Sequence, residues 1–209
     1  YICKPNGRFM NETKEHILKT SLILFLQKSY RDVTMKEIVQ KTELSKGAFY
    51  HYFSSKEELF KEIVGMFMSM GEVPYSSFEV SSLKDFYSKY VDYIDNSMQQ
   101  MSNLVDDEKG ESSNFNFFLI LFEAVNRFPE FLELELEMHK HDLDAWKSMI
   151  ALARKNKEIK SSSSDEDLAH LFLYSTDGVF IRFINNDNTK PYKEYLQNAF
   201  DTIYTNIKV

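Results

Sequence analysis

Apolar residues recur at steps of three and four along most of this chain, and no segment alternates apolar and polar residues over the length of a strand. Two stripes in the second half are the longest. One consists of Leu83, Tyr87, Tyr90, Ile94, Met98 and Met101, and the other of Leu132, Leu136, His139, Leu143, Trp146, Ile150 and Ala153. This spacing places each set on one face of a helix, so the pattern predicts an all-α fold.

Prolines, serine clusters and capping residues divide the pattern into about nine helices. The expected ranges are 11–29, 35–42, 46–52, 56–70, 83–101, 115–128, 129–157, 165–184 and 191–207. Between them we expect a loop at 71–81 that contains Pro74, a polar break at 106–113 and a serine linker at 161–164. Pro129 ends one helix and fits the first turn of the next.

Three helix starts are concentrated between residues 33 and 60. Thr34 with Glu37, and Ser55 with Glu58, have the spacing of a capping box, in which the hydroxyl and the carboxylate each satisfy a free backbone N–H. Ser45 is a third candidate N-cap. Because two of the helices are short and only a few residues separate them, the segment suggests a helix-turn-helix.

The second short helix carries an unusual number of polar donors. Phe49 and Phe53 are four residues apart and can face the core together, while Gly47 and Ala48 leave the first turn without side-chain bulk. Around them stand the donors Lys46, Tyr50, His51, Tyr52 and Lys56. A donor-rich outer face is typical of phosphate binding, but an ordinary three-helix arrangement with a solvated surface would have the same spacing.

This segment resembles the DNA-binding region of the TetR family of bacterial one-component transcription regulators. The matching positions are Phe25 at the end of the opening helix and then the runs 34–39 (TMKEIV), 45–53 (SKGAFYHYF) and 55–59 (SKEEL). The resemblance covers about residues 11 to 63. Two departures are His51-Tyr52, where many members have the histidine second, and Thr42-Glu43, where small residues are commoner.

The resemblance implies a domain organisation for the whole chain. Residues 11–55 would form the three-helix helix-turn-helix domain, 56–70 a connecting helix, and 71–209 a helical domain for effector binding and dimerisation. Met10 followed by Asn11 looks like a natural start, so residues 1–10 would contain an extension or an expression remnant. The implied function is a ligand-responsive regulator, with repression as the commoner mode, and not an enzyme.

The resemblance and the donor pattern together assign the contacts with a pseudo-palindromic, double-stranded operator. The DNA-binding residues are predicted to be Thr34, Lys36, Ser45, Lys46, Gly47, Ala48, Tyr50, His51, Tyr52 and Lys56. Of these, Thr34, Tyr50, Tyr52 and Lys56 are expected to hold phosphates, and Lys46, Ala48 and His51 to touch base edges. Loss of Lys56 should therefore weaken binding to all sequences alike.

A net charge of −7 is unusual for a DNA-binding protein, but the charge is unevenly distributed. Residues 1 to 62 hold 11 Lys and Arg against 8 Asp and Glu, whereas the remainder holds 14 against 24. Phosphate binding would thus be confined to one end of the chain. A single cysteine, Cys3, and the lack of an apolar run of about 18 residues fit a soluble cytoplasmic protein without a membrane span.

The last two helices are apolar on more than one side, which predicts a role in dimerisation. The family pairs these helices across a two-fold axis, and Gly178 would permit a close helix crossing. The predicted interface residues are Leu171, Ser175, Gly178, Val179, Phe183, Leu196, Phe200 and Ile203. The same helices could instead only cover the core of their own chain.

The central helices are rich in Met, Phe and Tyr, which are typical of roomy apolar sites. By analogy with the family they would enclose a small hydrophobic effector. The candidate lining residues are Phe67, Phe86, Tyr90, Tyr93, Phe118, Phe122, Trp146, Met149 and Tyr174. A stripe of this kind is also what a plain hydrophobic core requires.

Two alternative functions remain open at this point. Glu135 and His139 are four residues apart with His141 nearby, which could indicate a metal-dependent helical enzyme, although no third ligand has a useful spacing. No glycine-rich phosphate loop or nucleophile elbow is present. We therefore expect no cofactor and no metal. The second alternative is a protein of the same fold that binds DNA constitutively or uses its carboxy-terminal domain for a protein partner.

Overall fold

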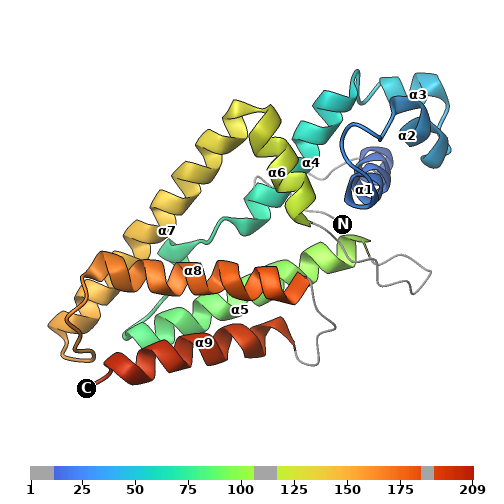
Figure 1. Cartoon of the computed structure of the whole chain (residues 1–209). Helices are drawn as coiled ribbons and strands as arrows, with labels where there is room; N and C mark the ends of the chain where they lie inside the picture. The colour runs from blue at the N-terminus through green and yellow to red at the C-terminus, as the bar shows by residue number, and fades with distance from the viewer. Residues whose placement is uncertain (1–11, 106–116, 185–190) are drawn as a thin grey trace. The chain divides into compact units, whose positions relative to one another are not determined.

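The computed structural model of the chain describes residues 12–105, 117–184 and 191–209. These residues form nine α-helices and one 3-10 helix, so the predicted all-α fold is confirmed (Figure 1). The helices are α1 (Glu12–Gln27), α2 (Met35–Lys41), α3 (Lys46–Tyr50), α4 (Lys56–Gly71), η1 (Tyr75–Ser77), α5 (Leu83–Val105), α6 (Phe117–Arg127), α7 (Pro129–Lys155), α8 (Asp165–Ile184) and α9 (Tyr192–Ile207). None of the described helices is long and apolar enough to cross a membrane.

Most helix starts lie where the sequence places them, and the differences are local. α3 ends at Tyr50 rather than Tyr52, because the Tyr52 N–H bonds to Phe49 O at 2.9 Å in a tighter turn. The expected loop at 71–81 contains the short helix η1. α5 continues to Val105, and the predicted polar break at 106–113 lies outside the described residues.

The described helices fall into two compact units. One unit comprises the described residues up to Gly71 together with those between Gln100 and Leu132, and within it α6 packs with α1 and α4. Aromatic rings fill the centre of this unit: Phe60 lies 5.0 Å from Phe25, 4.7 Å from Tyr30 and 6.0 Å from Phe128 between ring centroids. These contacts join α1, the segment after it, α4 and the end of α6 into one core.

The second unit comprises Glu72–Gln99 and Glu133–Val209. α8 and α9 lie side by side and antiparallel (Figure 1). Trp146 on α7 has no exposed surface and lies at the centre of the core, with ring centroids 5.0 Å from Phe86, 4.7 Å from Phe172 and 5.5 Å from Phe200. Each of these rings comes from a different helix, so Trp146 ties α5, α8 and α9 to α7.

A glutamate that follows α7 fixes the start of α5 within this second unit. The Glu158 carboxylate accepts the backbone N–H groups of Leu83 at 2.9 Å and Lys84 at 3.2 Å, and the Tyr204 hydroxyl at 3.2 Å. A negative charge is favourable at the amino-terminal end of a helix, where backbone donors are otherwise unpaired. Glu158 thereby connects the start of α5 with the last turn of α9.

Candidate nucleic-acid interface

Side-chain caps fix the two short helices of the amino-terminal unit. Thr34 accepts the Glu37 N–H at 3.2 Å, and Ser45 accepts the Ala48 N–H at 3.2 Å, so the predicted helix starts at Met35 and Lys46 are confirmed. The capping box at Thr34 is only half formed, because the Glu37 carboxylate pairs with the Lys28 ammonium rather than returning to the backbone.

The third cap differs from the prediction by one residue. Ser55 accepts the Glu58 N–H at 3.1 Å as expected. The Glu58 carboxylate, however, bonds the backbone N–H of Ser54 at 2.8 Å and its hydroxyl at 2.7 Å. These two hydrogen bonds hold the pKa of Glu58 below its usual value. The returning bond thus goes to the residue before the N-cap.

The turn between α2 and α3 contains a strained residue. Glu43 has a φ of 57°, in the left-handed region that residues with a Cβ rarely adopt. Next to it, Thr42 is buried, and its carbonyl lies 3.0 Å from His16 Nε2 of α1. This backbone conformation explains in physical terms why a small residue suits the turn better than glutamate.

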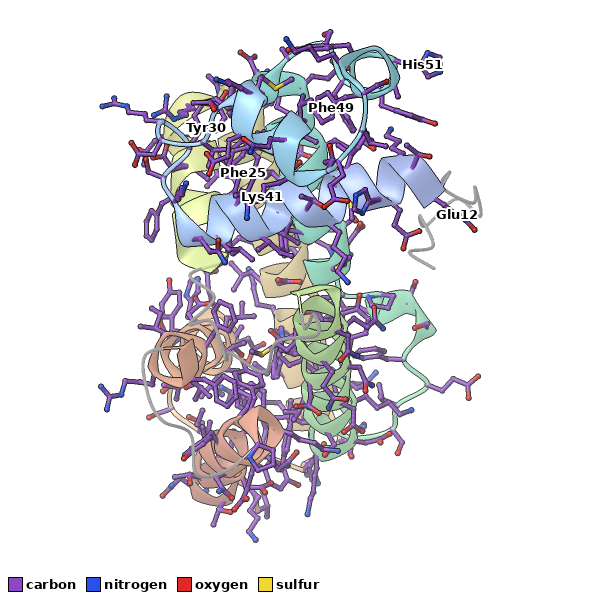
Figure 2. The ribbon with its side chains drawn as sticks, turned by 90° about the vertical axis from the view of Figure 1, so that its right-hand side faces the viewer. Glu12, Phe25, Tyr30, Lys41, Phe49 and His51 are labelled. Atoms are coloured by element: carbon purple, nitrogen blue, oxygen red, sulfur yellow. The ribbon has the colours of Figure 1, made fainter. Side chains whose placement is uncertain are left out.

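The predicted DNA-binding residues lie largely on the surface of this unit. Phe49 and Phe53 are both fully buried, with ring centroids 6.5 Å apart, as their spacing predicts. Figure 2 shows the Phe49 side chain inside the unit and His51 pointing outward. The exposed residues of the predicted set are Thr34, Lys36, Ser45, Lys46, Gly47, Ala48, Tyr50 and His51. Buried aromatic rings therefore support an exposed surface of donors and small residues.

Lys56 has an internal role that the sequence does not reveal. Its ammonium donates to the carbonyls of Tyr30 and Val33, both at 2.7 Å, and lies 4.3 Å above the Tyr30 ring. Burial lowers the pKa of this lysine. Two of its three hydrogens thus hold the segment that precedes the Thr34 cap, and its predicted phosphate contact stays a prediction. Tyr52 is likewise only partly exposed.

The Tyr30 ring receives a second cation from α6. The Arg127 guanidinium lies 4.8 Å from the ring centroid and also pairs with Glu123. Lys61 completes this region, since it lies 4.6 Å from the Phe128 ring and bridges Glu57 and Glu130. Sequence reasoning missed Tyr30 and Arg127, because nothing in a helical stripe indicates that two distant residues will stack.

Comparison with known proteins agrees with this geometry. Residues 17–63 match the family model described as bacterial regulatory proteins, tetR family. Residues 17–63 therefore belong to the TetR family. It is 52% identical over 50 residues to the HTH-type transcriptional regulator YerO of Bacillus subtilis strain 168, a match that spans 24% of this chain and only 17% of YerO.

Longer matches to TetR-type proteins are more distant. The chain is 22% identical over 190 residues to the transcriptional repressor DhaR of Mycobacterium sp. strain GP1, with 91% of each protein covered. The solved structure of the TetR-family regulator PfmR from Thermus thermophilus has a TM-score of 0.69 at 19% identity and covers 90% of this chain and 97% of that one. These comparisons support a DNA-binding regulator rather than an enzyme.

The predicted effector-lining residues do not form one site. Phe86, Tyr90, Trp146 and Met149 are buried in one core cluster of the second unit, and Tyr93 packs against it. Phe67 lies in the other unit, where it lines an apolar pocket between α1 and α4. Phe122 and Tyr174 are 64% and 57% exposed, and the side chain of Phe118 lies outside the described part of the structure.

The predicted dimer interface needs a correction. Leu196 and Phe200 have no exposed surface, because they fill the core of their own unit, and so cannot meet a second copy. Leu171 and Gly178 are exposed. The remaining candidates, Ser175, Val179, Phe183 and Ile203, are partly exposed. Apolar spacing alone could not tell which side of α9 faces the chain's own core.

The two histidines of the metal-site alternative point to different partners. The His139 ring stacks on His170 at 6.1 Å between centroids, whereas the His141 ring lies 5.5 Å from Tyr75. Within residues 12–105, 117–184 and 191–209, no group of three His, Cys, Asp or Glu is arranged to hold a metal ion. The described geometry therefore gives no support to the metal-dependent enzyme.

We expect Lys56→Met to lower the stability of the protein by about 1–3 kcal/mol, because two carbonyls would lose a charged donor while the apolar stem is kept. Urea unfolding at neutral pH measures the change. Lys46→Met is the matched control, since Lys46 is exposed and its loss should leave the unfolding midpoint unchanged. Equal midpoints for both variants would show that the ammonium does not order the segment before α2.

Proposed function

We propose that this chain binds double-stranded operator DNA as a homodimer, represses transcription there, and is released by a small effector. The observation that carries the proposal is the surface of α2 and α3. Eight of the ten predicted DNA-binding residues are exposed on it, and Phe49 is fully buried beneath. A short helix with donors and small side chains outside and an aromatic anchor inside is suited to the major groove.

The exposed residues divide into two kinds of proposed contact. Thr34 and Tyr50 have hydroxyls at the margins of the surface and would hold phosphates, as would Tyr52 and Lys56 with the parts that stay accessible. Lys46, Ala48 and His51 would touch base edges. The arrangement of the positive charges favours the same end of the chain, because residues 1 to 62 carry an excess of Lys and Arg while the remainder is acidic.

Dimerisation would bring two such surfaces to successive major grooves. α8 exposes Leu171, Tyr174 and Ile181, three large apolar side chains on one helix, and Gly178 lies among them. Several large apolar side chains exposed on one helix are commonly covered by a partner protein in the functional assembly. Two copies related by a two-fold axis would read half-sites about 34 Å apart, which matches a pseudo-palindromic operator.

The proposed control by a small molecule rests on the second unit. Its core gathers five of the predicted lining residues, Trp146 among them. An effector that binds there would favour a state in which the two reading surfaces no longer match the operator, with a coupling of about 1–3 kcal/mol. Operator affinity that no metabolite changes would instead favour constitutive DNA binding or a protein partner. The proposed place of action is the cytoplasm.

Gly47→Ala tests the proposed close approach of α3 to DNA. A Cβ at this position meets no atom within 4 Å, and alanine is the better helix former, so stability should stay the same or rise by up to about 1 kcal/mol. Affinity for an operator selected from genomic fragments should nevertheless fall by about tenfold, because the methyl group would occupy space that the DNA needs. Fluorescence anisotropy measures this affinity.

The matched control for that change is Gly65→Ala on α4, where an added Cβ is equally free of contacts. It should leave operator affinity unchanged. If both variants bind as well as the unaltered protein, α3 does not approach the DNA backbone closely, and the proposed interface is wrong.

Leu171→Glu should convert the proposed dimer into a monomer at micromolar concentration. Leu171 is 48% exposed, and a carboxylate placed there would have to lose its water in a buried interface. Light scattering gives the molar mass directly. Leu152→Glu is the control, because Leu152 on α7 is 40% exposed and lies outside the proposed interface. A protein that is monomeric without any substitution would contradict this part of the proposal.

A further inference from the structure

A group of polar side chains lies within the aromatic core of the second unit. We define this polar cluster as Tyr75, Tyr90, Asp142, Trp146, Asp177 and Tyr192. Its members come from η1, α5, α7, α8 and α9, so the fold brings five elements together at one place. A core that served packing alone would have no need of the Asp142 carboxylate and three phenols, since buried polar groups cost free energy unless they are paired.

The electrostatics show that these side chains converge on Tyr90. Burial raises the pKa of the Tyr90 phenol, the neighbouring Thr176 hydroxyl lowers it, and the groups of Asp142, Tyr192 and Asp177 raise it further. The Asp177 carboxylate in turn raises the pKa of Asp142. Asp177 is exposed, so the polar cluster reaches the surface at α8.

Three polar atoms of the cluster lack the partner that buried donors normally have. Tyr75 Oη, Trp146 Nε1 and Tyr192 Oη are buried and make no hydrogen bond in the described part of the chain. The Tyr75 hydroxyl lies beside both the Asp142 carboxylate and the Trp146 indole N–H, but with neither does it reach the geometry of a hydrogen bond. Native proteins rarely leave such groups unpaired, so three of them around one place indicate that a ligand or water completes the cluster.

The charge of the cluster indicates what kind of ligand this is. Burial raises the pKa of Asp142 to about 6, and the other groups that act on it are Tyr75, His141, His139 and Asp177. Neither lysine nor arginine is among them. Asp142 is therefore largely ionised at neutral pH, and the groups that lower its pKa are the Tyr75 hydroxyl and the His141 and His139 side chains rather than a lysine or an arginine.

The aromatic rings around the polar cluster, like the Asp142 carboxylate, favour a positively charged ligand. Tyr75 stacks on Phe86 at 5.6 Å and on Tyr90 at 6.3 Å, while Trp146 meets Phe86 at 5.0 Å and Tyr90 at 5.2 Å. The faces of aromatic rings attract cations, and the attraction grows where water is excluded. Carboxylates and ring faces are independent features, and both disfavour an anion.

We propose that the polar cluster binds a small organic cation with an apolar body, held through its charged nitrogen by Asp142 and the Tyr75 and Tyr90 rings. Hydroxyl groups of Tyr75 and Tyr192 accept hydrogens from the nitrogen or from a bridging water. This site deepens the effector part of the proposed function, on which its regulatory role rests. It also changes the expected effector from a purely hydrophobic molecule to a charged one.

The intact chain contains a suitable probe, because Trp146 is its only tryptophan and belongs to the cluster. Its fluorescence is followed at pH 7.5, without DNA, during titration with benzylammonium, benzyl alcohol or benzoate. These three compounds share one ring and differ in charge. Benzylammonium should bind at least about tenfold more tightly than benzyl alcohol, and benzoate should bind most weakly.

Asp142→Asn isolates the charge, since asparagine has nearly the same shape as aspartate. Affinity for benzylammonium should fall by about tenfold, while affinity for benzyl alcohol should not change. Asp144→Asn is the matched control: Asp144 lies two residues further along α7, is exposed, and should alter neither affinity.

Thermal unfolding separates loss of binding from loss of structure. The pKa of Asp142 is higher in the folded chain than its usual value near 3.8, so the ionised form destabilises the fold increasingly as the pH rises from about 4 to about 6. Asp142→Asn should therefore unfold at a higher temperature than the unaltered protein at pH 7.5. A more stable variant that binds the cation less tightly is the expected signature of a ligand site.

Equal affinity for the three compounds, tighter binding of benzoate, or unchanged benzylammonium binding in Asp142→Asn would overturn the inference. Two further outcomes separate it from the proposed function. Cation binding that leaves the operator complex intact supports the site and contradicts release by an effector. Release of the operator by an uncharged compound, with no binding of benzylammonium, contradicts the cation site and supports release by an effector.

Discussion

The short helices of the amino-terminal unit depend on the burial of aromatic rings beneath them. α2 has 7 residues and α3 has 5, and helices shorter than about 12 residues are not stable alone in water. The burial of Phe49 and Phe53 supplies the stability that the backbone hydrogen bonds of such short helices do not provide. The orientation of Lys46, Tyr50 and His51 toward solvent follows from that burial. The proposed DNA-reading surface thus depends on the aromatic side chains that are buried on the other face of the same helix.

Two cationic side chains stabilise the segment that precedes these short helices. Lys56 binds the two carbonyls that precede the Thr34 cap, and its ammonium lies over the Tyr30 ring. Arg127 at the end of α6 lies against the same ring. Within this one unit, a residue outside the helix-turn-helix thus contacts the segment that leads into α2. Glu123 pairs with Arg127 and so offsets part of the repulsion between the two cations on this ring.

How far the sequence predicts this structure depends on whether a feature is local. Caps such as Ser45 are local, because the hydroxyl and the N–H it binds are three residues apart, and these starts were predictable. Leu196 and Phe200 were assigned to a dimer interface but lie in the core, since a helix that is apolar on two sides does not reveal which side meets its own chain. Tyr30 was missed because its partners are distant in sequence.

Polar residues in the second unit were missed for a different reason. Asp142 precedes Trp146 by four residues and so shares its helix face, which was the available signal. A search for apolar lining residues passes over such an acid, although it is the unpaired charge, more than the rings, that distinguishes a ligand site from an ordinary core. Tyr192 and Asp177 could not have been connected with it, because only the packing of α8 and α9 brings them near Tyr90.

The central claim is that α3 is held on its aromatic anchor so as to enter the major groove. Mapping of protected bases on duplexes selected from genomic fragments, with the full chain at low ionic strength, tests it most directly. The account predicts two protected patches in the major groove, about 10 base pairs apart or a multiple of that spacing. A folded sample that prefers no duplex over competitor DNA, and protects none, would contradict it.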